Sequence, residues 1–261
     1  MPEKITYFPL IKDIPEYRWK NLAEKKIYFG HQSVGNNIIE GLKDVIKENP
    51  QIKLNIVETT DPEMFKTSIF AHSRVGKNHD PFSKNNAFTV FIENGIGGNA
   101  DFAFFKYCYV DVPAGTDVNK LFNDYRNAMS RLKKAYPDTT FIHVTVPLTA
   151  VQTGPKVWIK KIIGRPLGGY LDNISRNEFN NLLKAEYESK EPVFDLAMIE
   201  SIFPDGTAMT FKSNGRIFHA MVPEYTGDGR HLNEKGRRIV AEQLLVFLAD
   251  LVQQKMINTG A

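Results

Sequence analysis

The chain lacks three features that would each indicate a particular class of protein. It has a single cysteine, Cys108, which excludes an internal disulfide framework and a zinc cluster built on cysteines. It has no apolar run of the roughly 18 residues that a membrane-spanning helix needs, so we expect no membrane span. Its N-terminus, MPEKITYFPLIKDIPEYRW, lacks the uninterrupted apolar core of a secretory signal, and we therefore expect a cytoplasmic protein.

A strong charge of one sign is also missing. The 33 basic and 30 acidic residues leave a formal net charge of +3, and they are spread along the chain. A field of this size does not favour a nucleic acid as the main partner. With 261 residues, 42% of them hydrophobic, and neither a linker nor an internal repeat, the sequence predicts one domain that spans residues 1–261.

What the sequence does contain is an alternation of short apolar strands and amphipathic helices. Because parallel strands need crossover connections, this order predicts a three-layer α/β/α sandwich around a five-stranded parallel sheet. The expected strands are residues 26–29, 53–58, 101–105, 140–146 and 193–197. Helices are expected after residue 33 and over residues 118–136, 173–187 and 236–254.

A polar segment, residues 59–86, follows the second expected strand and is predicted to be a long loop. It carries His72, Gly76, His79 and Asp80, and it is too long to serve only as a connector. In open parallel sheets, ligands bind at the carboxyl ends of the strands. Residues that directly follow a strand are therefore the first candidates for a functional site.

The stretch KKIYFGHQSVGNNIIEGL, residues 25–42, places Ser33 directly after the first expected strand and at the start of a helix. One interpretation is that Ser33 caps the helix, since serine is among the preferred residues at that position. The other is that Ser33 is a nucleophile, because unpaired amides at a helix N-terminus can stabilise a developing oxyanion. Taken alone, the serine favours the cap.

A second motif, YTGDGRHLNEKGRRIVAEQLL, changes this balance. Asp228 and His231 stand three residues apart in a glycine-containing loop before the last helix. A nucleophilic serine needs a base, and an imidazole base needs a carboxylate that fixes its tautomer. A capping aspartate beside a surface histidine is the alternative. The order Ser33, Asp228, His231 on an alternating α/β scaffold favours the catalytic interpretation.

These two motifs make the sequence similar to the SGNH, or GDSL-type, hydrolase superfamily. Members carry the nucleophilic serine after the first strand and an Asp-x-x-His pair before the last helix, in a flavodoxin-like sandwich. DGRHLNEKG is the more specific match, whereas Gly30-His31-Gln32-Ser33 replaces the usual Gly-Asp-Ser. The resemblance implies that Ser33 is the nucleophile, His231 the general base and Asp228 its orienting partner.

The same resemblance suggests where the oxyanion donors lie. A glycine amide from the loop after the second strand is expected, and Gly76 is the best candidate, with Asn78 nearby. The family's third block normally supplies an asparagine, but residues 105–111 contain none. Lys106 and Tyr109 are candidates for the missing donor, and His31 is expected to line the pocket.

Other residues allow weaker hypotheses. His31, His72, His79 and Asp80 match no compact metal-ligand motif, so we expect no metal, and nothing indicates a cofactor. Cys108 could act as the nucleophile instead of Ser33, although a free cysteine is usually a buried core residue. The basic segment 156–170 is either a surface excursion or a flap over the substrate.

The sequence therefore predicts a serine hydrolase that cleaves a carboxylic ester through an acyl-enzyme. Family analogy suggests an O-acyl group, such as acetyl, on a carbohydrate, so the expected partner is a small-molecule or glycan ester; transfer to another acceptor is also open. A non-catalytic glycan-binding or interaction domain is the alternative, motivated by the absent asparagine. The sequence does not indicate an oligomeric state.

Overall fold

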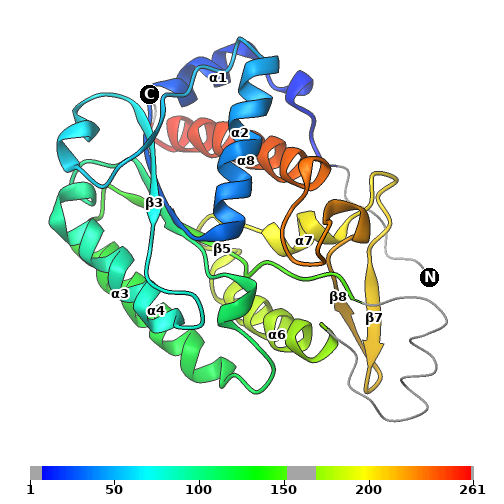
Figure 1. Cartoon of the computed structure of the whole chain (residues 1–261). Coiled ribbons are helices and arrows are strands. Elements are labelled where there is room, and N and C mark those ends of the chain that lie inside the picture. Colours follow the sequence, from blue (N-terminus) through cyan, green and yellow to red (C-terminus); the bar gives the residue numbers. More distant parts are fainter. Residues whose placement is uncertain (1–7, 152–168, 260–261) are drawn as a thin grey trace.

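The computed structural model describes residues 8–151 and 169–259. A parallel sheet lies between layers of helices (Figure 1). Its six strands pair in the order β2-β3-β1-β4-β5-β6. The strands are β1 (Lys26–His31), β2 (Ile56–Glu58), β3 (Ile69–Arg74), β4 (Phe102–Phe105), β5 (Thr140–Val144) and β6 (Val193–Phe194).

Helices cover both faces of this sheet. One face packs against α1 (Glu16–Ala23), α2 (Ser33–Glu48) and α8 (Glu234–Thr259), and the other against α3 (Pro81–Phe91), α4 (Val118–Ala135) and α6 (Tyr170–Tyr187). Side chains alternate along β1, so that Ile27 and Phe29 enter the first core while Tyr28 enters the second. The predicted three-layer α/β/α sandwich is confirmed.

The sheet has one strand more than predicted, because β3 lies within the segment that was expected to be a loop. The polar residues His72 and Ser73 favoured a loop in the prediction. In the structure they are buried, and their side chains contact residues of β1. The hydroxyl groups of Ser73 and Tyr28 lie 2.7 Å apart, and Nδ1 of His72 lies 3.0 Å from Nε2 of His31. Without the short edge strand β2, the order β3-β1-β4-β5-β6 is the flavodoxin-like one.

The last strand is shorter than the predicted 193–197. It stops at Phe194 because the side chain of Asp195 accepts a hydrogen bond from the amide of Met198 (3.1 Å) and so begins helix α7 (Leu196–Ser201). A separate antiparallel hairpin, β7 (Thr210–Ser213) and β8 (Arg216–His219), was not predicted.

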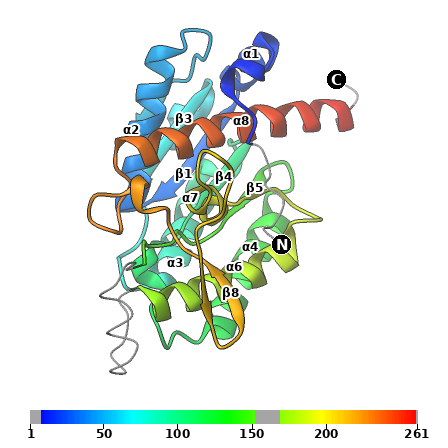
Figure 2. The same ribbon diagram turned by 90° about the vertical axis from the view of Figure 1, so that its right-hand side faces the viewer.

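Helices α2 and α8 cross in close contact on one face of the sheet (Figure 2). At this crossing Gly41 is essential, since a Cβ atom there would lie 2.4 Å from the carbonyl oxygen of Arg237. Both helices start near the carboxyl ends of the strands. The crossing therefore sets how their first residues lie relative to each other.

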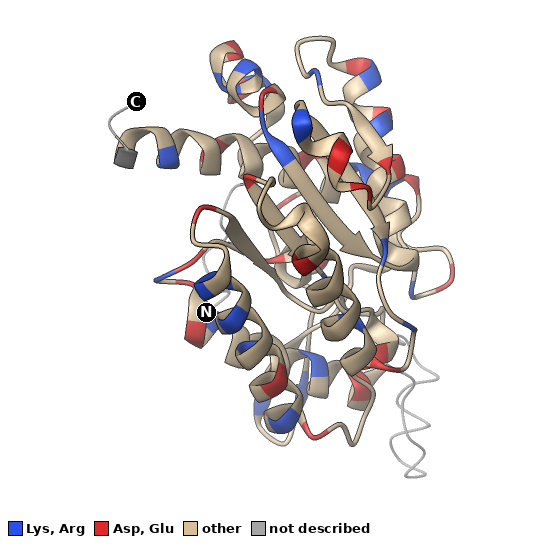
Figure 3. Cartoon of the chain, turned by 90° about the vertical axis from the view of Figure 1, so that its left-hand side faces the viewer, with Lys and Arg blue, Asp and Glu red and all other residues tan. Residues whose placement is uncertain are grey.

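Basic and acidic residues are interspersed along the outer helices in the view of Figure 3. Several of them form ion pairs across the α2–α8 crossing, including Arg237 with Glu40 and Asp44. Within residues 8–151 and 169–259, no helix combines the length and the apolar character that crossing a bilayer would require.

Candidate active site

Ser33 is the first residue of α2 and directly follows the turn at the end of β1. The capping position belongs to Gln32, whose side chain makes no cap hydrogen bond. The Oγ atom of Ser33 instead lies 3.2 Å from Nε2 of His231. The interpretation of Ser33 as a simple helix cap is therefore wrong.

Asp228 and His231 are joined to each other as well as to the serine. Nδ1 of His231 lies 2.7 Å from Oδ2 of Asp228, while Oδ1 of Asp228 accepts hydrogen bonds from the amides of Arg230 (2.8 Å) and His231 (2.7 Å). The left-handed conformation of Gly229 (φ +81°) permits this tight loop. Because Nδ1 donates to the carboxylate, the lone pair of Nε2 is directed at the serine hydroxyl.

The carboxylate of Asp228 stays charged in this loop. Partial desolvation opposes ionisation, but hydrogen bonds from the ring and amide of His231 and from the amide of Arg230 outweigh it and lower the pKa of Asp228. A permanently charged carboxylate beside Nδ1 favours the imidazolium that forms when Nε2 takes up a proton.

Gly76 and Asn78, the predicted oxyanion donors, follow β3. The side chain of Gln32 donates hydrogen bonds to the carbonyl groups of Val75 (3.0 Å) and Gly76 (2.8 Å), which ties this loop to the serine turn. Gly76 is left-handed (φ +56°), and a Cβ atom would lie 2.6 Å from the backbone of Lys84. Asn78 is held through its side-chain oxygen, 3.1 Å from Nζ of Lys84.

Of the two predicted replacements for the missing asparagine, only Tyr109 contacts the serine–histidine pair among the described interactions. Its hydroxyl lies 3.4 Å from Nε2 of His231, and burial raises its pKa, so the hydroxyl remains a donor at neutral pH. Lys106 is buried, with its ammonium group near the carbonyl of Tyr107 (3.4 Å) and Sγ of Cys108 (3.7 Å).

His31, expected to line the pocket, lies beneath the first turn of α2. It is 1% exposed and pairs with His72, and Gly35 accommodates it, because a Cβ there would lie 2.2 Å from the His31 side chain. Burial lowers the pKa of His31 to about 3, with a smaller contribution from Lys106. A neutral His31 therefore supports the serine turn from below.

A buried ion pair, Lys84 with Asp111, joins the first turn of α3 to the loop after β4. The carboxylate also accepts hydrogen bonds from the amides of His79 (3.0 Å) and Cys108 (2.6 Å). The His79 bond helps to hold a left-handed residue (φ 65°), a conformation that costs energy outside glycine. This pair fixes the two loops that flank the serine.

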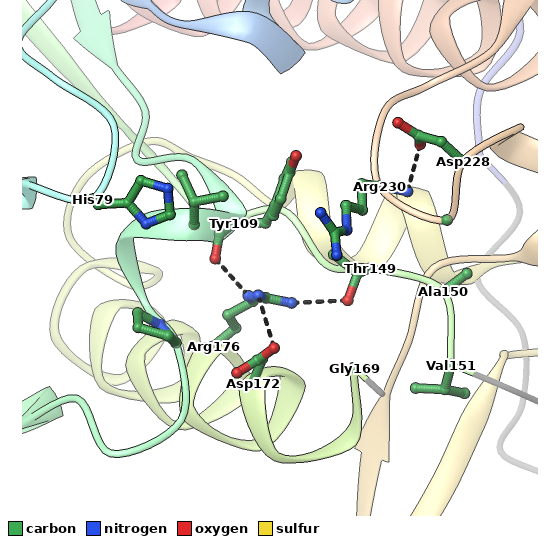
Figure 4. A pocket seen from close by; sticks show the side chains of 13 residues that line it. His79, Tyr109, Thr149, Ala150, Val151, Gly169, Asp172, Arg176, Asp228 and Arg230 are labelled. Carbon is green, nitrogen blue, oxygen red and sulfur yellow. Dashed lines mark hydrogen bonds and ion pairs between the residues drawn. The ribbon is translucent and has the colours of Figure 1, made fainter. Parts of the chain in front are cut away.

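A cavity of about 470 Å³ lies beside this constellation, with Tyr109 and the loop of Asp228 in its wall (Figure 4). Four polar residues in its wall carried no sequence-based hypothesis: Thr149, Asp172, Arg176 and Arg230. Arg176 stands in the first turn of the predicted helix 173–187, and Arg230 lies within the Asp-x-x-His motif itself. Only Arg230 could have been identified from the sequence, because it lies between Asp228 and His231 in the motif.

Three weaker hypotheses have different outcomes. Cys108 is buried, and its backbone amide donates to Asp111. Among the described interactions its thiol has no contact with His231, so the geometry does not favour Cys108 as the nucleophile. No cluster of three metal-ligating side chains occurs in the described part of the chain. The basic segment 156–170 lies outside the described residues except at its last two positions.

Comparison with known proteins gives matches at the level of structure only. No family model matches the chain, and no curated protein matches it. A member of the lipolytic protein G-D-S-L family from Veillonella parvula is similar at 17% identity and a TM-score of 0.44, over 84% of this chain and 95% of that one. A carbohydrate esterase family 3 structure from Talaromyces cellulolyticus is similar at 14% identity and a TM-score of 0.45, over 88% and 97%.

A third similar structure is the periplasmic domain of a lipopolysaccharide acetyltransferase from Salmonella ser. Paratyphi A, at 13% identity and a TM-score of 0.44, over 90% of this chain and 84% of that one. In strand order, and in the arrangement of Ser33, Asp228 and His231 around the end of β1, the chain resembles the SGNH, or GDSL-type, hydrolases.

Proposed function

We propose that the protein is a serine hydrolase that cleaves a carboxylic ester through an acyl-enzyme on Ser33. The observation that carries this proposal is the continuous chain of contacts from Asp228 through His231 to Ser33, with distances of 2.7 and 3.2 Å. Ser33 and His231 are 198 positions apart in the sequence. In the structure Nε2 of His231, which can accept a proton, faces the Ser33 hydroxyl, which must lose one.

In the first half of the reaction, the hydroxyl oxygen of Ser33 attacks the ester carbonyl. His231 takes the proton on Nε2, and the charged Asp228 stabilises the resulting imidazolium. The amide of Ser33, at the N-terminus of α2, donates to the developing oxyanion together with the amide of Gly76. His231 then passes the proton to the leaving alcohol.

In the second half, water replaces the alcohol. His231 removes a proton from that water, which attacks the acyl group on Ser33, and the acid is released as Ser33 regains its proton. An alcohol in the place of water would give acyl transfer through the same groups. Tyr109 and Asn78 are further donors at this site, and an acetyl ester on a carbohydrate is the substrate that the family resemblance favours.

Hydrolysis of p-nitrophenyl acetate by the wild type and by Ser33→Ala tests this proposal. We expect measurable wild-type turnover, stoichiometric labelling by a fluorophosphonate, and the loss of both in Ser33→Ala. Thr116→Ala, an exposed hydroxyl in the turn before α4, is the matched control and should retain both. A wild type that neither turns over nor is labelled would favour the alternative, a binding domain, which a glycan-binding screen would then examine.

A further inference from the structure

The cavity beside Tyr109 contains two guanidinium groups, from Arg176 on α6 and from Arg230 in the loop before α8. Two carboxylates also lie in its wall, Asp172 and Asp228. The charge that the cavity offers to a ligand depends on which of these four groups already have partners within the protein.

Both carboxylates have partners. Asp228 accepts from the His231 ring and from two backbone amides. Oδ1 of Asp172 accepts from the amide of Ala114 at 2.8 Å, and its Oδ2 lies 3.8 Å from Nη2 of Arg176. Neither carboxylate forms an ion pair with the Arg230 side chain among the described residues.

Arg176 is a fixed part of the cavity wall. Its Nε donates to the carbonyl of Tyr109 (2.9 Å), and its Nη1 donates to Thr149 (2.9 Å) and Asn173 (2.8 Å). Burial lowers its pKa to about 10, which leaves the group charged at neutral pH. Within the described residues, Nη2 has no acceptor at hydrogen-bond distance, so two N–H groups remain for a ligand.

The side chain of Arg230 makes no hydrogen bond or ion pair with any residue in 8–151 or 169–259. Most of the other described arginines pair with a carboxylate, among them Arg216, Arg237 and Arg238, while Arg74 and Arg126 do not. Figure 4 shows the Arg230 guanidinium directed inward, near Tyr109 and Thr149, while Asp228 points away from it. A planar, permanently charged fork facing a cavity suits bidentate binding of a carboxylate.

We propose that this cavity binds a carboxylate on the substrate, held by Arg230 with Arg176 beneath it; this inference rests on the esterase activity proposed above. Only the Arg230 guanidinium lacks an ion-pair partner among these four groups, which suits one carboxylate, and the charges of Asp172 and Asp228 in the wall disfavour a second anion. The carboxylate lies close to the scissile ester, since Tyr109 forms part of the cavity wall and also approaches Nε2 of His231. The substrate class is therefore an ester of an acidic molecule.

Paired esters test this inference. 4-Acetoxybenzoate and 4-acetoxybenzamide differ in charge but little in shape, and the measured quantity is the ratio of their kcat/KM values. We expect Arg230→Gln to lower this ratio about tenfold, the typical effect of losing a hydrogen bond to a charged group, and Arg230→Glu to lower it further. Arg131→Gln, an exposed arginine on α4 outside the cavity, should leave the ratio at the wild-type value.

A second pair of esters shows whether the carboxylate belongs to the acyl side or the alcohol side of the substrate. p-Nitrophenyl hemiglutarate and p-nitrophenyl valerate carry the charge difference on the acyl side, whereas the acetoxybenzoates carry it on the alcohol side. Dependence on Arg230 in either pair supports the inference and identifies the side. Equal ratios in wild type and Arg230→Gln for both pairs, with hydrolysis still dependent on Ser33, would overturn the inference while leaving the esterase proposal intact.

Binding gives a readout that does not need catalysis. In the Ser33→Ala background, 4-hydroxybenzoate should bind at least several-fold more weakly when Arg230→Gln is added, as measured by ligand-observed NMR, while 4-hydroxybenzamide should be unaffected. If no ester is hydrolysed by the wild type, the esterase proposal falls, and this measurement alone decides the anion site. Equal binding of 4-hydroxybenzoate to both variants would exclude it.

Discussion

Two groups of polar residues at the carboxyl ends of the strands are built in opposite ways. The outer polar group, Asp228, Arg230 and His231, lies on one loop, and the side chains of His231 and Asp228 are 39% and 53% exposed. The inner polar group, His31, Lys84 and Asp111, lies beneath the site, where the side chains of Lys84 and Asp111 are 0% exposed. Both groups are close to Ser33, yet only the outer one contacts its hydroxyl.

The difference indicates that the outer group serves the reaction and the inner group serves the stability of the site. Exposed groups exchange protons and ligands readily. They make few contacts with the core, so removing them changes the free energy of unfolding little. Buried charges are expensive to leave unpaired, so they fix the geometry of the loops that they join. Variants in the outer group should therefore change the rate, and variants in the inner group should change the free energy of unfolding.

The largest effect is expected in the outer group. His231→Ala should lower kcat by about 10⁴ or more, because the serine then lacks its base. The free energy of unfolding should change by less than about 0.5 kcal/mol, the usual range for exposed side chains. Steady-state kinetics and urea unfolding of the same preparation measure both. A rate within tenfold of the wild type would contradict the assignment of His231 as the base.

The next effect concerns the inner group. Lys84→Met should lower the free energy of unfolding by about 3–5 kcal/mol, because it leaves the carboxylate of Asp111 buried without its countercharge. Lys66→Met, which removes an exposed lysine paired with Glu63, is the matched control and should cost less than about 1 kcal/mol. Urea unfolding at pH 7 distinguishes them. Similar costs for the two variants would refute the proposed role of the buried pair.

The smallest effect is a pH dependence in the inner group. Burial lowers the pKa of His31 to about 3 from the ordinary histidine value of 6.5, so the unfolded chain binds the proton first as the pH falls. Stability from His31 is present above pH 6.5 and is lost as the pH drops toward 3, amounting to about 2 kcal/mol between pH 7 and 5.

His31→Gln should remove this part of the acid destabilisation, leaving what His72 and His143 contribute, since burial lowers their pKa values as well. Urea unfolding at pH 7 and pH 5 measures the difference for wild type and variant. An unchanged difference would mean that His31 is not the group that titrates.

The sequence predicted the outer group better than the inner one. Ser33 follows a strand and precedes a helix, and Asp228 and His231 are three residues apart, so local pattern and general chemistry were enough to bring them together as a hypothesis. Their roles remain predictions that the kinetic experiments test. Arg230 was overlooked because an arginine in a surface loop is usually solvated.

His31 was predicted as a pocket residue, but the buried contacts of the inner group were missed because they join residues far apart in the sequence. His72 and Ser73 suggested a polar loop, whereas in the structure they belong to β3 and are satisfied by His31 and Tyr28 on the adjacent strand. Lys84 and Asp111 lie 27 residues apart and compensate each other only once the chain is folded. Pairing of this kind leaves no periodic pattern for sequence inspection to detect.

The close crossing of α2 and α8 has a consequence for the reacting atoms. Ser33 begins α2, and His231 lies three residues before α8 begins, so the gap between their side chains depends on the spacing of two helix axes. Gly41 sits about 12 Å along α2 from Ser33, at 1.5 Å per residue, where one added methyl group would push against Arg237. The turnover rate is thus adjustable from a position remote from every reacting group, through interhelical spacing alone.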